Sequence, residues 1–299
     1  MLLSIVYLAN LILNVLGLKA VTFYYGLNNF LFSCVLYGQF FPFVFFYFLY
    51  RESTINRINF IIGFIDYIEL IFLYIGFSGI NVVQYLSYRN ISIVINFMLS
   101  YLFLEKEFCN YQKFGILLNF ISCVVLLFLG GTDNMFNCLM ILTYSFLYST
   151  IGFLIEKYKE DNINFIHIKL VSSSFQISTY LFYSLFSNTV FRELEKSKSI
   201  GLFVLMIFIG ASEYIYYFLK NRIIQTVENG SIYTNILDMI RRLITMILGI
   251  YIFDESNPNY VYYCYSVMLV GCFLFYFNEQ IKQRLESIPQ STTELSVRV

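Results

Sequence analysis

The stretch that decides the fold covers residues 99–129 and reads LSYLFLEKEFCNYQKFGILLNFISCVVLLFL. An apolar segment ends at Glu105-Lys106-Glu107, and a second one, Tyr111–Leu129, follows after a short polar turn. A bilayer core about 30 Å thick needs roughly 20 apolar residues in a helix. Unbonded backbone groups are prohibitive in hydrocarbon, so such a segment must be helical, and the period-two alternation of a membrane barrel is absent. This stretch therefore predicts two membrane helices joined by a charged turn.

The same pattern recurs along the chain. Of the 299 residues, 59% are hydrophobic and 13% are charged, whereas a soluble protein is close to half apolar and about a quarter charged. We therefore expect an all-α membrane protein with ten transmembrane helices. The apolar windows lie at about 2–19, 29–50, 58–78, 80–104, 112–130, 135–156, 163–187, 199–219, 229–253 and 259–278.

Composition and motifs argue against several function classes. The 19 basic and 19 acidic residues leave no net charge, so nothing points to nucleic acid as a partner. The six cysteines are widely spread and His167 is the single histidine, so neither a zinc site nor a disulfide framework is readable. No Ser-His pair, His/Asp cluster or nucleotide loop occurs. We therefore expect no enzyme activity, no metal and no cofactor.

The positions of Lys and Arg predict the orientation in the membrane. With the N-terminus in the cytosol, eleven basic residues, among them Lys106 and Lys220, fall on the cytosolic side and four on the other side. Both termini are therefore expected in the cytosol. His167 and Lys169, near the cytosolic end of the seventh span, are expected to snorkel to the interface. The first span lacks a basic leader and a cleavage site, which favours the Golgi or endoplasmic reticulum over an organelle that requires import.

The two halves of the chain share one pattern. The best register pairs Tyr101–Glu107 with Ile250–Ser256, and in both an apolar helix reaches an acidic residue, a short polar turn and another apolar helix. Five helices in each half, with both termini on one side, require the halves to have opposite orientations. We expect two inverted five-helix repeats, residues 1–131 and 132–281, followed by a cytosolic tail, residues 282–299.

These features resemble the drug/metabolite transporter superfamily. Leu99–Phe108, continuing through Gln112–Leu118, is similar to the family's helix-four exit, acidic turn and helix five. Thr234–Thr245, which reads TNILDMIRRLIT, is similar to the helix-nine basic pair of nucleotide-sugar transporters and of sugar-phosphate (triose-phosphate) translocators. The resemblance implies that Arg241 and Arg242 bind substrate phosphate in a central cavity.

Two further positions bear on the resemblance. Arg89-Asn90 lies where those families often carry another cation, although it is nearer the start of helix four than in some subfamilies. The Gly-Ala-Leu-Asn-Lys motif of the GDP-mannose carriers is absent. The resemblance therefore implies a phosphorylated cargo without naming its sugar or base.

Three arginines, Arg89, Arg241 and Arg242, fall inside expected spans. A cation at mid-membrane costs about 2.5–3.5 kcal/mol, so each must face protein or water and have a counter-charge. The planar guanidinium donates two parallel hydrogen bonds to phosphate oxygens, which suits a phosphate cargo. Adjacent helical residues diverge by about 100°, so one arginine should face the cavity more squarely, and we slightly favour Arg241. Thr234 and Asn235 are candidates to hydrogen-bond a sugar.

Several carboxylates are candidate counter-charges. Asp238 has the i,i+3 and i,i+4 spacing to pair with both helix-nine arginines, although one carboxylate cannot balance two cations. The other candidates for charge pairing or gating are Asp66, Glu69, Glu213 and Glu228. Asp66 and Glu69 share a helix face, where like charges repel, so one of them could carry a proton; they could equally pair with Arg89. Purely structural pairing of the arginines stays open beside substrate contact.

We expect a solute carrier, an antiporter in the lipid bilayer whose partner is a small-molecule anion. It would exchange a nucleotide sugar for a nucleoside monophosphate, or a sugar phosphate for phosphate, by alternating access between the two repeats. The alternative is a drug/metabolite transporter for a neutral or cationic metabolite, coupled to protons through Asp66, Glu69 or Glu213. A non-transporting scaffold or receptor is the third hypothesis, and a homodimer is left open.

Overall fold

The computed structural model is helical between short turns, and the described residues contain no strand. The description covers residues 3–10, 12–13, 40–50, 54–77, 85, 88–129, 135–161, 163–186, 200–227, 229–253 and 259–286. Residues 3–10 form a helix, and the helices with defined bounds are α3 (Phe40–Tyr50), α4 (Arg57–Phe77), α6 (Ile91–Phe103), α7 (Asn110–Leu129), α8 (Met135–Lys157), α9 (Phe165–Phe186), α11 (Ile200–Thr226), α12 (Gly230–Phe253) and α13 (Asn259–Glu286). The expected all-α class is confirmed over this part of the chain.

Each described helix falls on one of the expected apolar windows. Three of them have the length and composition to cross a membrane, namely Asn110–Leu129, Met135–Lys157 and Asn259–Phe277. The ends of two helices differ from expectation, because α11 continues to Thr226 and α13 to Glu286, beyond the expected ends at residues 219 and 278. In α11 the extension is stabilised by burial, since the first residue past the expected end, Lys220, is only 1% exposed.

Many large apolar side chains lie on the surface and several charged side chains lie in the interior, which is the reverse of a water-soluble protein. Large apolar side chains such as Phe128, Phe182 and Phe48 are 83%, 66% and 65% exposed. The arginines Arg241 and Arg242, by contrast, are 1% and 0% exposed. Large exposed apolar surfaces are rare on soluble monomers, and charged side chains are almost never fully buried unless they are paired. This distribution suits a helical bundle whose surround is lipid.

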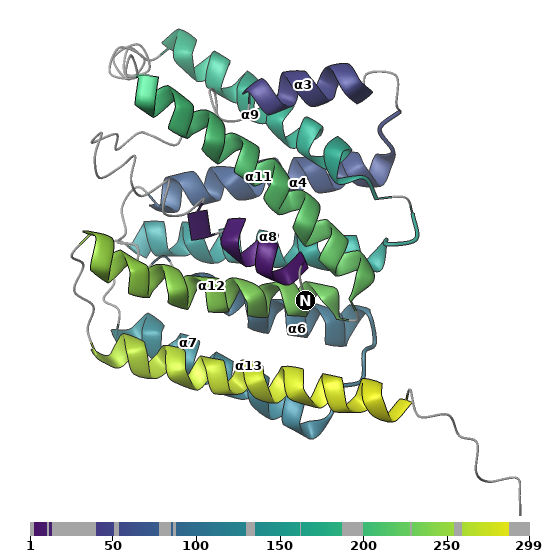
Figure 1. Ribbon diagram of the computed structural model, residues 1–299, viewed down its shortest axis with the longest axis vertical. Helices are drawn as coiled ribbons and strands as arrows, with labels where there is room; N and C mark the ends of the chain where they lie inside the picture. Colours follow the sequence, from purple (N-terminus) through teal and green to yellow (C-terminus); the bar gives the residue numbers. More distant parts are fainter. Residues whose placement is uncertain are drawn as a thin grey trace, which may run out of the picture.

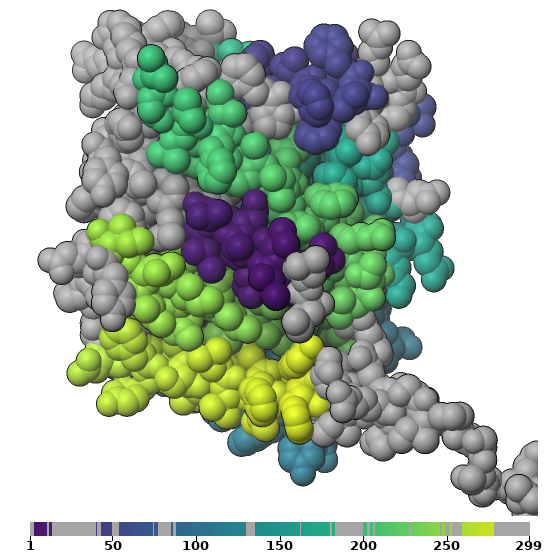
Figure 2. All heavy atoms as spheres, in the orientation of Figure 1, coloured from purple at the N-terminus to yellow at the C-terminus, as the bar shows by residue number. Residues whose placement is uncertain are grey.

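The helices stack in layers (Figure 1). One edge of the bundle is formed by α7 and α13 and the opposite edge by α3 and α9, with α6, α12, α8, α4 and α11 between them. The N-terminal residues lie across the surface between α11 and α12 (Figure 2). There Tyr7 packs in a buried cluster with Tyr216, Tyr217 and Leu237. The start of the chain is therefore part of the core between these two helices.

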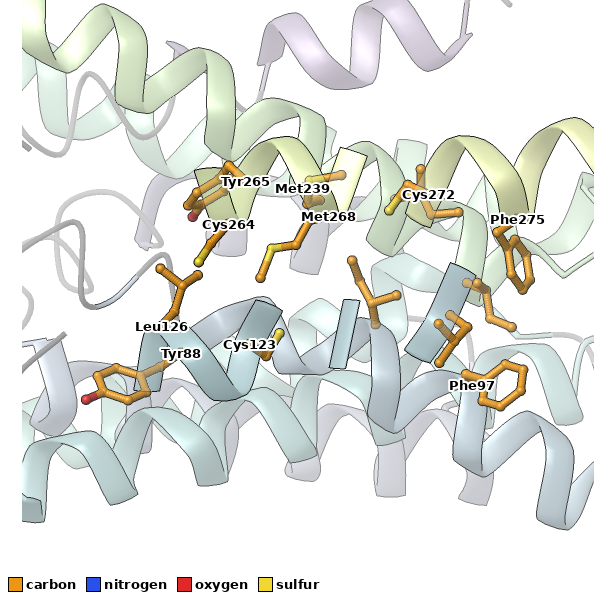
Figure 3. Packing of buried hydrophobic residues seen from close by; sticks show 14 of the residues in the cluster. Tyr88, Phe97, Cys123, Leu126, Met239, Cys264, Tyr265, Met268, Cys272 and Phe275 are labelled. Atoms are coloured by element: carbon orange, nitrogen blue, oxygen red, sulfur yellow. The ribbon is translucent and has the colours of Figure 1, made fainter. Parts of the chain in front are cut away.

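Helix α7 packs closely on α13, with sulfur-containing and aromatic side chains between them (Figure 3). The backbones approach most closely at two glycines. A Cβ atom added to Gly115 would lie 2.4 Å from the carbonyl oxygen of Gly271, and one added to Gly271 would lie 2.5 Å from the carbonyl oxygen of Gly115. Small residues permit this kind of close backbone packing in membrane helices. The contact is reciprocal, so each helix depends on the other's glycine.

We predict that Gly271→Ala destabilises the protein by about 1–3 kcal/mol, because the new methyl group would meet backbone that cannot move without separating the helices. Thermal unfolding of the purified protein in detergent measures the effect. Gly152→Ala is the matched control, since a Cβ there would have its nearest neighbours at 3.6 Å, an ordinary van der Waals distance. Equal unfolding temperatures for the two variants would contradict the assigned packing.

Candidate functional site

The centre of the buried polar interior is Asp238, on α12, whose side chain is 0% exposed. The hydroxyl of Tyr148, on α8, donates a 2.6 Å hydrogen bond to Oδ2 of this carboxylate. The hydroxyl of Tyr7, in the N-terminal helix, donates a 3.2 Å hydrogen bond to Oδ1. Three helices distant in the sequence are thereby joined at one carboxylate.

Three arginines approach the same carboxylate. Nη2 of Arg89 lies 3.5 Å from Oδ2 and Nη2 of Arg242 lies 3.7 Å from it. Nε of Arg241 lies 3.9 Å from Oδ1. Both arginines of α12 lie within 3.9 Å of Asp238, at the i,i+3 and i,i+4 positions from which the sequence predicts pairing. A single negative charge is thus shared by three cations.

Arg89 is surrounded by tyrosines. Its Nη1 donates a 2.9 Å hydrogen bond to the hydroxyl of Tyr85, and its Cζ lies 5.1 Å from the ring centroid of Tyr144 and 4.8 Å from that of Tyr148. Cations above aromatic faces are stabilised by the ring quadrupole, and more so when water is excluded. These rings therefore stabilise Arg89 at the start of α6 in addition to its contact with Asp238.

The two helix-nine arginines differ in their remaining partners. Nη1 of Arg242 donates a 2.5 Å hydrogen bond to Oδ1 of Asn90, whose own Nδ2 lies 3.3 Å from the sulfur of Met268. Nε and Nη2 have no hydrogen-bond partner among the described residues in either Arg241 or Arg242. Both arginines therefore retain unused donors next to Asp238.

Thr234 and Asn235, the candidate sugar contacts, are occupied within the protein. Oγ1 of Thr234 donates to the carbonyl of Ser231 at 2.9 Å, as does Nδ2 of Asn235 at 2.9 Å. Oδ1 of Asn235 accepts a 3.0 Å hydrogen bond from Oγ of Ser92 on α6. In this conformation the two residues stabilise the start of α12 and its contact with α6.

A second group of buried charges lies between α4, α9 and α11. Nζ of Lys169 lies 3.2 Å from Oδ2 of Asp66, and both side chains are 0% exposed. The same ammonium stands 3.8 Å from the ring centroid of Tyr217. The expectation that His167 and Lys169 snorkel to an interface is wrong, because both side chains are turned into the bundle, where Lys169 gains a carboxylate and an aromatic face.

Lys220 belongs to this interior as well. Its Nζ stands 3.5 Å from the ring centroid of Tyr148, the residue that donates to Asp238. The expected end of the eighth span at residue 219, which left Lys220 outside the bundle, is wrong, since α11 continues through it to Thr226. The sequence does contain an indication that Lys220 is buried. Tyr216 and Tyr217 precede it by four and three residues, so the three side chains share one face of the helix.

The buried charges do not balance. Glu156 is buried and pairs with Lys106; the other buried charged side chains of the described ranges are five cations and three carboxylates. They are Arg89, Lys169, Lys220, Arg241 and Arg242, with Asp66, Glu69 and Asp238. Asp66 pairs with Lys169 and not with Arg89, Glu213 is half-buried on α11, and Glu228 lies outside the described residues. The described part of the chain contains no group of side chains that could hold a metal ion.

A separate polar network ties one end of the bundle together. Nζ of Lys106, after α6, contacts Glu156 at the end of α8 and donates a 2.7 Å hydrogen bond to Oδ1 of Asn229. The carboxylate of Glu156 also accepts a hydrogen bond from the hydroxyl of Ser231 on α12. Glu105 and Asn229 have positive φ angles of 50° and 52°, a conformation that costs energy in non-glycine residues. The backbone is thus held in an unfavourable conformation on both sides of this contact.

Comparisons with known proteins identify the fold alone. No protein-family model matches the sequence, and no curated protein matches it significantly. Among 24 matching chains of solved structures, one described as "Crystal structure of protein" has a TM-score of 0.63 at 13% sequence identity. The alignment covers 96% of this chain and 98% of that chain. The fold and the site thus define an all-helical protein with membrane-length helices around a buried cluster of excess positive charge.

We predict that Asp66→Asn and Lys169→Met each destabilise the protein by about 3–5 kcal/mol, because each leaves one buried charge without its partner. The double variant removes both charges and should recover most of that loss. A double-mutant cycle on unfolding free energies measures the coupling. A double variant that loses the sum of the two single losses would contradict the ion pair.

Proposed function

We propose that this protein is a carrier that exchanges phosphorylated organic anions across a membrane, a nucleotide sugar for a nucleoside monophosphate or a sugar phosphate for phosphate. The observation that carries the proposal is that, apart from the Lys106–Glu156 pair, the buried interior holds five cations against three carboxylates, an excess of two positive charges. A phosphate monoester carries a charge of about −1.5 to −2 at pH 7. Such a ligand would neutralise the excess without further ions.

The type and state of the cations support phosphate as the charged group. Three of the five are arginines, whose fork of donors matches phosphate oxygens and which stay charged when desolvated. Arg241 already holds unused donors beside Asp238. The sequence offers no additional acid in residues 14–39 or 78–84, which fall in the first, second and fourth expected helices. A bound anion would balance these charges.

The ten-helix arrangement with two inverted repeats is part of the proposal. The contacts of α6 with α7 in the first half have a counterpart in those of α12 with α13 in the second half. Likewise, α4 packs on α9 as α11 packs on α3. Exchanging the halves therefore converts these contacts into one another, although within the described residues the contacts of α11 with α12 and with α9 have no comparable counterpart between α4 and α6 or α3. The reciprocal contact of Gly115 with Gly271 fits a two-fold axis between α7 and α13. This correspondence supports a shared five-helix unit.

Alternating access requires that one end of the site closes while the other opens. The network of Lys106, Glu156, Asn229 and Ser231 connects the loop after α6 to helices of the second half. Under the proposed topology this network closes the cytosolic end, with both termini cytosolic and the carrier in the Golgi or endoplasmic reticulum. The conformation described here would then be closed toward the cytosol.

We predict that liposomes containing the protein take up labelled nucleotide sugars when preloaded with nucleoside monophosphate, or labelled sugar phosphates when preloaded with phosphate, and that Arg241→Gln reduces uptake about tenfold or more. The reduction follows from the loss of a charge-assisted hydrogen bond. Arg222→Gln, the same change at an exposed position of α11, is the matched control.

Two results would count against this function. Inactivity of the wild-type protein across the panel, with no stabilisation by any phosphate compound, would exclude the anion carrier. Uptake of a neutral or cationic solute that collapses with a protonophore would favour the proton-coupled alternative.

A further inference from the structure

Two buried charged groups outside the arginine cluster lack hydrogen bonds. Glu69, on α4, is 2% exposed, and Lys220, on α11, is 1% exposed. Oε2 of Glu69 and Nζ of Lys220 have no hydrogen-bond partner within the described part of the chain. No ion pair joins Glu69 to Lys220 there, although their charges are opposite. An acceptor for the ammonium and a donor for the carboxylate are therefore both needed at this place.

Leaving such groups unsatisfied is expensive. A buried polar group without a partner costs about 1–3 kcal/mol, and a charged one costs more. Lys220 gains some stabilisation from the face of Tyr148, at 3.5 Å, but an aromatic ring accepts no full hydrogen bond. The pair therefore fits a polar ligand that both accepts and donates hydrogen bonds.

Lys220 adjoins the arginine cluster through Tyr148, and it shares the ring of Tyr217 with Lys169, the partner of Asp66. Glu69 lies one helical turn after Asp66 on the same face of α4. Nζ of Lys220 and Cζ of Arg89 lie 3.5 and 4.8 Å from the ring centroid of this tyrosine, and its hydroxyl donates to Asp238. A ligand whose phosphate contacts the arginines would extend past Tyr148 to Glu69 and Lys220.

We infer that Glu69 and Lys220 form a second subsite, which binds the hydroxyl groups of the sugar in a phosphorylated substrate. The inference rests on the proposed function, since the subsite would bind the uncharged sugar part of the same substrate whose phosphate the arginines bind. Hydroxyl groups donate to the carboxylate of Glu69 and accept from the ammonium of Lys220, so one sugar ring satisfies both residues. The substrate class is therefore sugar phosphates and nucleotide sugars in preference to inorganic phosphate.

The tyrosines nearby favour a sugar over a nucleobase at this subsite. Proteins that bind a nucleobase without base-specific hydrogen bonds do so by stacking the base on a free aromatic face. Here cations stand over Tyr144, Tyr148 and Tyr217, while Tyr7 stacks on Tyr216 with ring centroids 5.4 Å apart. The aromatic faces beside Lys220 are thus already engaged, and hydrogen bonds are the remaining means of recognition.

The test compares inorganic phosphate, ribose 5-phosphate and 2-deoxyribose 5-phosphate as ligands of the purified full chain. Ligand-dependent shifts of the unfolding temperature give apparent affinities. We expect the wild-type protein to bind ribose 5-phosphate about tenfold more tightly than phosphate, with the deoxy compound between them, because each hydrogen bond to a charged group is lost separately. Glu69→Gln should remove most of this preference and change the affinity for phosphate by about twofold or less. Lys220→Met should also remove the preference, and it should weaken phosphate binding as well, because it removes one of the surplus cations.

Exposed changes of the same kind, Glu107→Gln and Lys159→Met, serve as matched controls. Equal wild-type affinities for phosphate and ribose 5-phosphate, or a preference that survives Glu69→Gln, would overturn the subsite and leave the anion site standing. Such a result is also expected if water alone satisfies the two groups. Absence of stabilisation by all three ligands would overturn the proposed function itself. The wild-type comparison decides the matter even if a variant fails to fold.

Discussion

The carboxylate of Asp238 is the interaction on which the rest of the interior depends. It accepts hydrogen bonds from Tyr7 and Tyr148 and lies within ion-pair distance of Arg89, Arg241 and Arg242. Moving an ion from water into a low-dielectric interior costs several kcal/mol even after relaxation, so three buried guanidinium groups require a counter-charge. Tyr7 lies in the N-terminal helix, Arg89 just before α6, Tyr148 on α8, and Arg241 and Arg242 on α12. Because all five side chains contact one carboxylate, that carboxylate determines how these helices meet.

One carboxylate does not complete the balance, and the surplus shapes the chemistry of the site. Charges attract more strongly where water is excluded, so an interior with unpaired cations has a high affinity for anions. The protein stabilises its cations in part by aromatic faces, as with Arg89, Lys169 and Lys220. A ring quadrupole adds no formal charge and does not compete with a ligand for the donors. The tyrosines therefore stabilise the buried cations without neutralising them.

Much of the helical framework follows from the sequence, because backbone groups in lipid allow little besides helices and the apolar windows set their lengths. The pairing of Asp238 with Arg241 and Arg242 also follows, since the spacing along one helix is sufficient. The contacts of Lys169 with Asp66 and of Lys220 with Tyr148 join residues on different helices. Their distances depend on helix rotation and tilt, which apolar windows leave undetermined, so the general rule that lysines snorkel gave the wrong location.

The contact of Tyr7 with Asp238 makes the extreme N-terminus a working part of the centre. In most proteins the first few residues tolerate truncation and fusion because they lie at the surface with few contacts. Here a variant that lacks the residues up to Tyr7 would keep the three arginines but lose one hydrogen-bond donor to Asp238. It would also lose the packing of Tyr7 between α11 and α12. An affinity tag or fluorescent reporter joined close to Tyr7 is accordingly expected to disturb the charged centre, even though no arginine is touched.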